Sequence, residues 1–215
     1  MGERFKDKVV LVTGGSRGLG RAISLGFARE GAKVVVASRK LASCEQVVAL
    51  IEAEGGAALA HAAHMGDMAA LDALIEASYA HFGRVDILVN NAGTGEHGGG
   101  CVINVISVAA LATPAYSGIY AATKAALQAL TEVMAQEWAA WNIRVNALAP
   151  GSYHSDLTDS AIETIPGYGD GMVAAALIPR IADTEEILNP VFYLASEGYT
   201  TGITLVADGG LMAKR

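Results

Sequence analysis

A short apolar run followed at once by a glycine-rich turn is the feature that most constrains the fold. Residues 8–13 (K-V-V-L-V-T) are mostly β-branched, as in a strand buried within a parallel sheet. A glycine turn (G-G-S-R-G-L-G) and a helical stretch to about Glu30 follow, before Gly31. Backbone N–H groups and the helix dipole attract an anion there, and glycine lets a pyrophosphate come close. The turn therefore predicts a nucleotide site that includes Gly14, Ser16, Arg17, Gly18, Leu19 and Gly20.

The same alternation of strand and helix continues along the chain. We expect further strands at 33–38, about 57–64, 85–90, 101–106, 143–149 and 204–207, and helices at 41–54, 68–82, about 119–141 and from 183. A length of 215 residues with 52% hydrophobic and 17% charged residues suits one folded domain. The pattern predicts an α/β fold: a Rossmann-type, doubly wound parallel sheet in three layers, forming a single domain over residues 1–215.

Composition excludes several partners. The net charge of −7 comes with no basic stripe, so we expect no nucleic-acid partner. No apolar run reaches the ~18–20 residues of a membrane span, and the first residues lack a secretory apolar core. Cys44 and Cys101 form no pattern, so we expect thiols in a cytoplasmic protein.

The end of the second expected strand bears on the choice of cofactor. An NAD site usually has an acidic residue there for the ribose 2′-OH, whereas this chain has Ser38 and Arg39. Arg17 in the glycine turn can reach the same place, and two guanidiniums suit a 2′-phosphate. We therefore expect NADP(H), with NAD less favoured. The alternative is that both arginines are solvated surface residues.

Two histidines raise the question of a metal. His61 and His64 are three apart on an expected strand, so they should face opposite sides, and we expect no metal site. Asp67 follows that strand and is expected at the ligand edge of the sheet, near an adenine.

Three residues between 107 and 124 form the candidate catalytic group. Tyr120 and Lys124 are four apart in an alanine-rich helical run, so both lie on one face. An ammonium roughly 4–5 Å from a phenolate stabilises it by about 3–4 kcal/mol at an effective dielectric near 20, which favours proton transfer at neutral pH. Ser107 closes the run at 101–106, at the carboxyl end of a strand where ligands bind. The alternative is an ordinary helix that happens to carry both residues.

Taken together, T-G-G-S-R-G-L-G (13–20), N-N-A-G (90–93), Ser107, Y-A-A-T-K (120–124) and P-G (150–151) resemble the short-chain dehydrogenase/reductase family. The resemblance covers nearly the whole chain. It implies that Lys124 holds the nicotinamide ribose and that the long alanine-rich helix pairs with a second copy in a dimer or homotetramer. Packing of that helix on its own sheet is the alternative. The resemblance also implies cofactor contacts from Asn90, Ala92, Gly93, Tyr120, Pro150, Gly151 and Ser155.

One departure from the family concerns the connection after N-N-A-G. Only nine residues (92–100) precede Cys101, whereas a parallel crossover usually takes about a dozen or more and contains a helix. Roughly thirty to forty residues are missing, between about 94 and 100, by comparison with a whole crossover. Either the printed sequence omits a segment or the chain has a true deletion. We favour an omission, because a bare apolar sheet face should aggregate. The family's active-site asparagine lies in that helix, so no residue here can be assigned its role.

These observations predict reversible hydride transfer between NADP(H) and a small-molecule carbonyl or secondary alcohol, with Tyr120 as general acid/base. A reductase of 3-oxoacyl-carrier-protein thioesters is a narrower alternative, and a non-turnover NADP sensor or scaffold is an alternative of a different class. The irregular, glycine-containing stretch at about 152–179 is expected to be a mobile lid over the ligand edge. Arg180 alone does not form a basic patch for an acidic carrier protein.

Overall fold

Seven strands hydrogen-bond side by side in the order β3-β2-β1-β4-β5-β6-β7. The computed structural model describes residues 2–90, 100–112, 115, 117–196 and 198–214. The described pairs β1–β2, β2–β3, β1–β4 and β6–β7 are all parallel, which confirms the expected Rossmann-type α/β fold. The strands are β1 (Val9–Thr13), β2 (Lys33–Ser38), β3 (Ala57–Ala62), β4 (Ile87–Asn90), β5 (Gly100–Val105), β6 (Ile143–Pro150) and β7 (Thr204–Ala207).

The chain divides into two compact units, and β5 runs through both. The first unit contains Met1–Val102 and Trp141–Ile143, and the second contains Ile103–Ala140 and Arg144–Arg215. Each unit builds its own part of the core and is described by itself below.

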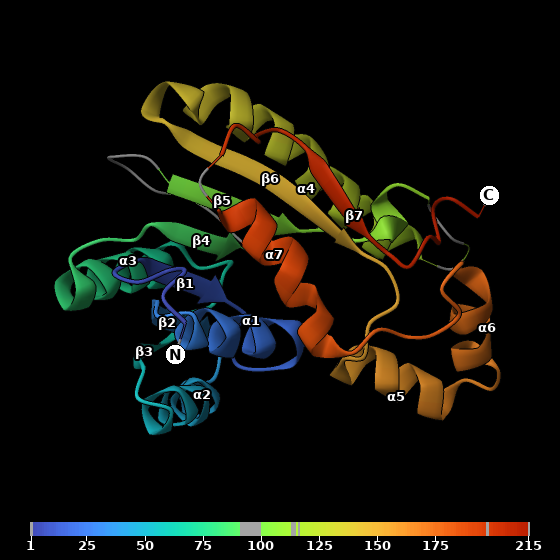
Figure 1. Cartoon of the computed structure of the whole chain (residues 1–215), viewed down its shortest axis with the longest axis horizontal. Helices are drawn as coiled ribbons and strands as arrows, with labels where there is room; N and C mark the ends of the chain where they lie inside the picture. Colours follow the sequence, from blue (N-terminus) through green and yellow to red (C-terminus); the bar gives the residue numbers. More distant parts are fainter. Residues whose placement is uncertain (1, 91–99, 113–114, 116, 197, 215) are drawn as a thin grey trace. The chain divides into compact units, whose positions relative to one another are not determined.

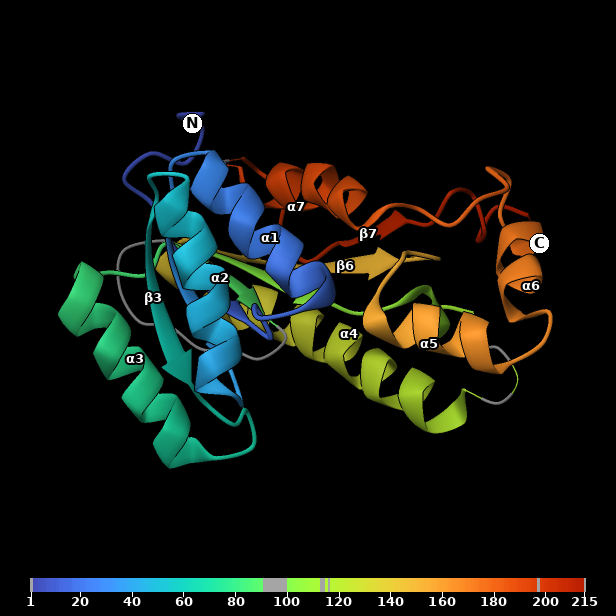
Figure 2. The same ribbon diagram turned by 90° about the horizontal axis from the view of Figure 1, so that it is seen from below.

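In the first unit, α1 (Gly18–Arg29), α2 (Leu41–Ala53) and α3 (Met68–Phe82) cover the strands. Right-handed crossovers place α1 and α2 on one face and α3 on the other, as Figures 1 and 2 show. All five residues of β1 are buried, and Phe27 of α1 is fully buried against this part of the sheet. The continuous β-branched run at 9–13 is explained by this burial on both faces.

The second unit places β6 between α4 (Gly118–Trp138) and α7 (Leu188–Ala195) in both views (Figures 1 and 2). Asn146 of β6 is fully buried, donates to Thr200 O at 3.0 Å and accepts from Ile203 N at 3.2 Å, which holds the approach to β7. The remaining short elements are η1 (Val108–Ala110), α5 (Asp156–Thr164), α6 (Tyr168–Ala175) and η3 (Thr184–Ile187); η2 (Ala139–Trp141) follows α4.

Two expectations about local structure were wrong. The stretch 152–179 is not irregular, because it contains α5 and α6; Ser155 caps α5, and α6 starts after Gly167 in the left-handed region. The third strand ends at Ala62, not at His64, which lies in the following turn and accepts from Gly66 N at 3.1 Å. None of the helices in the described part of the chain is both long and apolar enough to cross a membrane.

Candidate functional site

The glycine turn between β1 and α1 owes its shape to close backbone packing. Gly14 has φ of 65° and Gly18 has φ of 51°, both in the region that side chains avoid. A Cβ on Gly20 would stand 2.2 Å from Gly14 O, so the first turn of α1 lies directly against the loop. Gly15 N donates to Ala37 O at 3.2 Å, which ties the turn to the end of β2.

The amino end of α1 fits an anion. Its N-cap, Arg17, has extended backbone, and no side chain caps this helix end in the described structure. A helix start that its own N-cap side chain leaves uncapped can direct its first N–H groups at a pyrophosphate. Arg17 is exposed, whereas Ser16 and Leu19 are partly buried. The turn thus fits the phosphates of a dinucleotide.

Ser24 is a residue of this turn that sequence reasoning missed. It is fully buried, and its hydroxyl donates to Gly20 O at 2.9 Å, with Gly15 O at 3.4 Å. These contacts connect the first turn of α1 to the glycine turn on the buried side of the helix. A serine in a helix carries no sequence signal of such a role.

Two further expected cofactor residues lie beyond β2 and β3 in the same unit. Ser38 is partly buried with its Oγ 3.1 Å from Cys44 Sγ, and Arg39 beside it is exposed. Asp67 is the N-cap of α3, where its Oδ1 accepts from Ala69 N at 3.0 Å and Ala70 N at 3.3 Å. This capping role was not foreseen. The cofactor contacts of all three stay predictions.

Tyr120 and Lys124 lie one turn apart on α4, as their spacing predicted. The Lys124 ammonium donates to Val105 O at the end of β5 at 2.9 Å and stands 5.9 Å from the centre of the Tyr120 ring. Partial burial lowers the pKa of Lys124. The strand end therefore holds a cation beside the tyrosine, whose side chain is 45% exposed and open to a ligand.

Ser107 follows β5 by two residues and caps η1, which packs against α4. Its Oγ accepts from Ala109 N at 3.2 Å, so its O–H remains able to donate. The structure thus joins Ser107 and Lys124 through the end of β5: one caps the turn after the strand and the other bonds its last carbonyl. Asn104, inside β5, is fully buried and donates to Thr131 Oγ1 at 2.9 Å, which is a structural contact.

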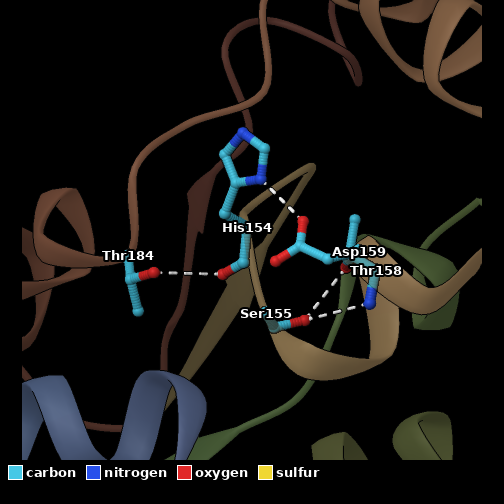
Figure 3. Close-up of polar contacts among 5 residues, drawn as sticks. All are labelled: His154, Ser155, Thr158, Asp159 and Thr184. Carbon is cyan, nitrogen blue, oxygen red and sulfur yellow. Dashed lines mark hydrogen bonds and ion pairs between the residues drawn. The ribbon is translucent and has the colours of Figure 1, made fainter. Parts of the chain in front are cut away.

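The end of β6 and the segment after it contain three further expected cofactor residues, Pro150, Gly151 and Ser155. Gly151 N donates to Ala207 O at 2.9 Å, and a Cβ on Gly151 would stand 2.7 Å from Asp208 Cα, so only glycine fits after Pro150. Ser155 caps α5: its hydroxyl accepts from Thr158 N at 3.2 Å and donates to Thr158 Oγ1 at 3.0 Å (Figure 3). Sequence reasoning missed His154, which Figure 3 shows beside Asp159.

The N-N-A-G turn is largely undescribed. Asn90 is the last residue of β4, while Ala92 and Gly93 lie outside the described residues, as does most of the short connection 92–100. Among the described residues, no group of three or more histidine, cysteine or acidic side chains could hold a metal ion.

Comparison with known proteins decides the family. The profile of the short chain dehydrogenase family matches residues 8–98, and that of enoyl-(acyl carrier protein) reductase matches residues 95–212. A 3-oxoacyl-[acyl-carrier-protein] reductase of Staphylococcus aureus is 34% identical, over 95% of this chain and 98% of that protein. The chain is a short-chain dehydrogenase/reductase.

Solved structures agree with this family assignment. An L-sorbose reductase from Gluconobacter frateurii, complexed with NADPH and L-sorbose, is 28% identical, with a TM-score of 0.87 over 99% of both chains. A 7α-hydroxysteroid dehydrogenase, complexed with NADH and 7-oxo glycochenodeoxycholic acid, is 30% identical, with a TM-score of 0.90 over 96% of this chain and 95% of that one. This short-chain dehydrogenase/reductase therefore belongs to an oxidoreductase family whose members bind nicotinamide cofactors of either kind.

Proposed function

We propose that this chain is an NADP(H)-dependent oxidoreductase that interconverts a small carbonyl compound and its secondary alcohol. The observation that carries the proposal is the Lys124 ammonium, which is anchored on Val105 O and stands 5.9 Å from the Tyr120 ring. A cation fixed beside the ring can stabilise the negative charge that develops on the tyrosine oxygen as its proton moves, which favours proton transfer through the tyrosine.

Each residue of the group has a distinct role. A bound nicotinamide cofactor supplies the hydride in reduction and accepts it in oxidation. Tyr120 gives its proton to the carbonyl oxygen in reduction and takes it back in oxidation. Ser107 donates a hydrogen bond to that oxygen as negative charge develops. Lys124 stabilises the negative charge that develops on the tyrosine oxygen during proton transfer and, by the family resemblance, holds the ribose hydroxyls.

The preference for NADP(H) rests on charge at the ribose end. Arg17 in the glycine turn and Arg39 after β2 are both exposed, and Gly15 N–Ala37 O joins their two segments. A 2′-phosphate adds a dianion that two guanidiniums would bind. Among the solved relatives one binds NADPH and another NADH, so the arginines of this chain carry the argument. We expect NADPH to bind tighter than NADH in fluorescence titrations.

The decisive experiment replaces Tyr120 by Phe. We expect Tyr120→Phe to lower kcat roughly a hundredfold to ten-thousandfold, because the proton donor is lost, with NADPH affinity unchanged. Consumption of NADPH is followed by absorbance with a panel of ketones and aldoses or ketoses. Tyr193→Phe, at an exposed tyrosine of α7, is the matched control and should keep full activity. Near-normal turnover in Tyr120→Phe would remove this residue from the mechanism.

The same assay separates an enzyme from a sensor. Binding of NADPH without its consumption by the wild-type protein across the whole panel would favour a sensor or scaffold. The complete group of Ser107, Tyr120 and Lys124 supports an enzyme, because a protein that only binds the cofactor has no need of a proton donor.

The charge of residues 152–179, the segment expected to cover the ligand edge, disfavours an acidic carrier protein as substrate. This segment contains Asp156, Asp159, Glu163 and Asp170 and no lysine or arginine. Arg180, just beyond it, is held in a two-pronged ion pair with Glu186 at 2.5 and 2.6 Å. The 34% identical Staphylococcus aureus reductase favours the carrier-protein alternative. We place a small neutral substrate first, because like charges repel an acidic partner.

The short connection and the oligomer belong to this proposal. The alignment with that reductase runs over 246 residues, although this chain has 215, so positions are missing from this chain. We place the gap between about 94 and 100, where the two family profiles meet. An intact mass of the expressed protein tests this: 22.1 kDa means a true deletion, and a larger mass means an omitted segment.

We also propose a dimer or tetramer in the cytoplasm. On α4, Leu130 is 49% exposed and Val133 is 46% exposed, which is apolar surface suited to pairing with a second copy. Cys44 and Cys101 are both free and buried, and the cytoplasm keeps such thiols reduced. Light scattering of wild type and Leu130→Asp measures whether α4 contributes to assembly.

A further inference from the structure

His154 is a junction between three segments of the second unit. Its backbone N–H donates to Ala182 O at 2.9 Å, and its carbonyl accepts from Thr184 Oγ1 at 3.2 Å. Its ring Nδ1 lies 2.7 Å from Asp159 Oδ1, as Figure 3 shows. One residue thus connects the chain leaving β6 to residues 182–184 and to the first turns of α5.

The ring contact fixes how the chain enters α5. Ser155 is the N-cap, so His154 precedes the cap and Asp159 is the fourth residue after it in the helix. Apolar residues commonly pair at these two positions and set the entry angle of the chain; here a histidine and an aspartate do so. None of the nine residues of α5 is buried. A helix this short has little stability of its own, so contacts at its start determine its direction.

Residues 180–186, which we call the strap, give this junction a fixed base. The strap is closed by the Arg180–Glu186 ion pair and by Asp183 N, which donates to Glu186 Oε2 at 2.8 Å. Ala182 N donates to Ser152 O at 2.9 Å, beside the bond between His154 and Ala182. The backbone on both sides of Tyr153 is therefore bound to the strap. Through its ring contact with Asp159, His154 connects this bound backbone to α5.

The orientation that results defines what Ser155 can bind. Its hydroxyl donates to Thr158 Oγ1 and accepts from Thr158 N, which leaves one acceptor lone pair. A ligand group that meets Ser155 here must be a hydrogen-bond donor, such as the N–H of a carboxamide.

We propose that His154 is a positioning residue: by bonding Asp159 and the strap, it holds Ser155 and the start of α5 where Ser155 accepts a hydrogen bond from the carboxamide of a bound nicotinamide. The proposal rests on the proposed function, which supplies the nicotinamide. It predicts that His154 acts through geometry and not through proton transfer to substrate.

Three substitutions of His154 separate the effect of the hydrogen-bond donor at Nδ1 from the effect of side-chain size. Asparagine places an N–H donor about where Nδ1 stands, glutamine places one about where Nε2 stands, and leucine has none. We expect His154→Gln and His154→Leu to weaken NADPH binding roughly fivefold, as for one lost hydrogen bond, with kcat little changed. His154→Asn should stay within about twofold of wild type, and Asp159→Ala should match His154→Leu.

Hydrogen exchange of residues 156–164 is measured without any ligand on the same variants. Exchange should quicken with glutamine, leucine and Asp159→Ala, and stay as in wild type with asparagine and with Glu163→Gln, a charge-matched control on α5. Equal NADPH affinity in all variants, or loss in His154→Asn equal to that in His154→Leu, overturns the proposal. If wild type binds neither NADPH nor NADH, the proposed function fails, and unchanged exchange in His154→Leu then separately overturns the role of His154.

Discussion

The helix starts of α1 and α5 are built on nearly the same backbone and closed in opposite ways. The N-cap of α1, Arg17, has φ of −154° and ψ of 167°, and the N-cap of α5, Ser155, has φ of −165° and ψ of 162°. Ser155 fills its helix end with its own hydroxyl, whereas no side chain caps α1 in the described structure. An arginine can only donate, so it cannot satisfy N–H groups. An open helix end can receive an anion, whereas one closed by its own residues keeps its direction.

The difference extends to what supports each helix. Close backbone contact between Gly14 and Gly20 supports α1, and Ile23 and Phe27 are buried beneath it. Side-chain contacts support α5, which buries none of its residues. Substitutions should therefore damage the first site through backbone displacement and the second through lost hydrogen bonds.

The largest effect that this comparison predicts is at Gly20. A Cβ there would stand 2.2 Å from Gly14 O, so Gly20→Ala must move the loop away from α1. We expect a loss of about 1–3 kcal/mol in the free energy of unfolding, measured by urea denaturation, and loss of NADPH binding in a fluorescence titration. Gly171→Ala in α6 is the control, since an added Cβ there would meet no described atom within 4 Å apart from its chain neighbours and the backbone of its own helix. Equal stability of the two variants would show that the glycine turn is not held by backbone contact.

An intermediate effect is expected at Ser155. Ser155→Ala removes the acceptor for Thr158 N and should destabilise the start of α5 by about 1 kcal/mol. Hydrogen exchange of residues 156–164 should quicken about fivefold, with little change in the global unfolding midpoint. Thr164→Ala, where the hydroxyl donates to Ser160 O at the far end of α5, should leave exchange in the first turn unchanged. If exchange in Ser155→Ala is as slow as in wild type, the hydroxyl of Ser155 does not stabilise the start of α5.

The smallest effect concerns pH and the strap. The guanidinium of Arg180, followed by the backbone N–H of Asp183, lowers the pKa of Glu186 from 4.5 to about 2. Because the folded protein holds this carboxylate ionised, its stabilising effect is complete above about pH 4.5 and is lost as the pH falls toward 2. We expect Glu186→Gln to flatten the fall in stability between pH 4.5 and 2, slightly because both side chains are about half exposed, and less at 1 M salt. Urea denaturation across this window checks it, and an unchanged slope in Glu186→Gln would contradict it.

The sequence by itself determined the alternation of strands and helices, the glycine turn and the four-residue spacing of Tyr120 and Lys124. Each of these depends on neighbours within a few residues: β-branched runs, positive φ at glycine, and the period of a helix. The capping box formed by Asp183 and Glu186 is likewise a local feature, since its two residues are three apart.

Only the tertiary structure decided what these elements bind to. Lys124 meets Val105 O from nineteen residues away, and Thr184 meets His154 O from thirty residues away. Ser155 and Asp67 are helix caps, a role that the sequence analysis did not predict, and α5 and α6 formed where no regular structure was expected. Such contacts depend on where the sheet brings distant segments together, and a local pattern of residue types does not predict that placement.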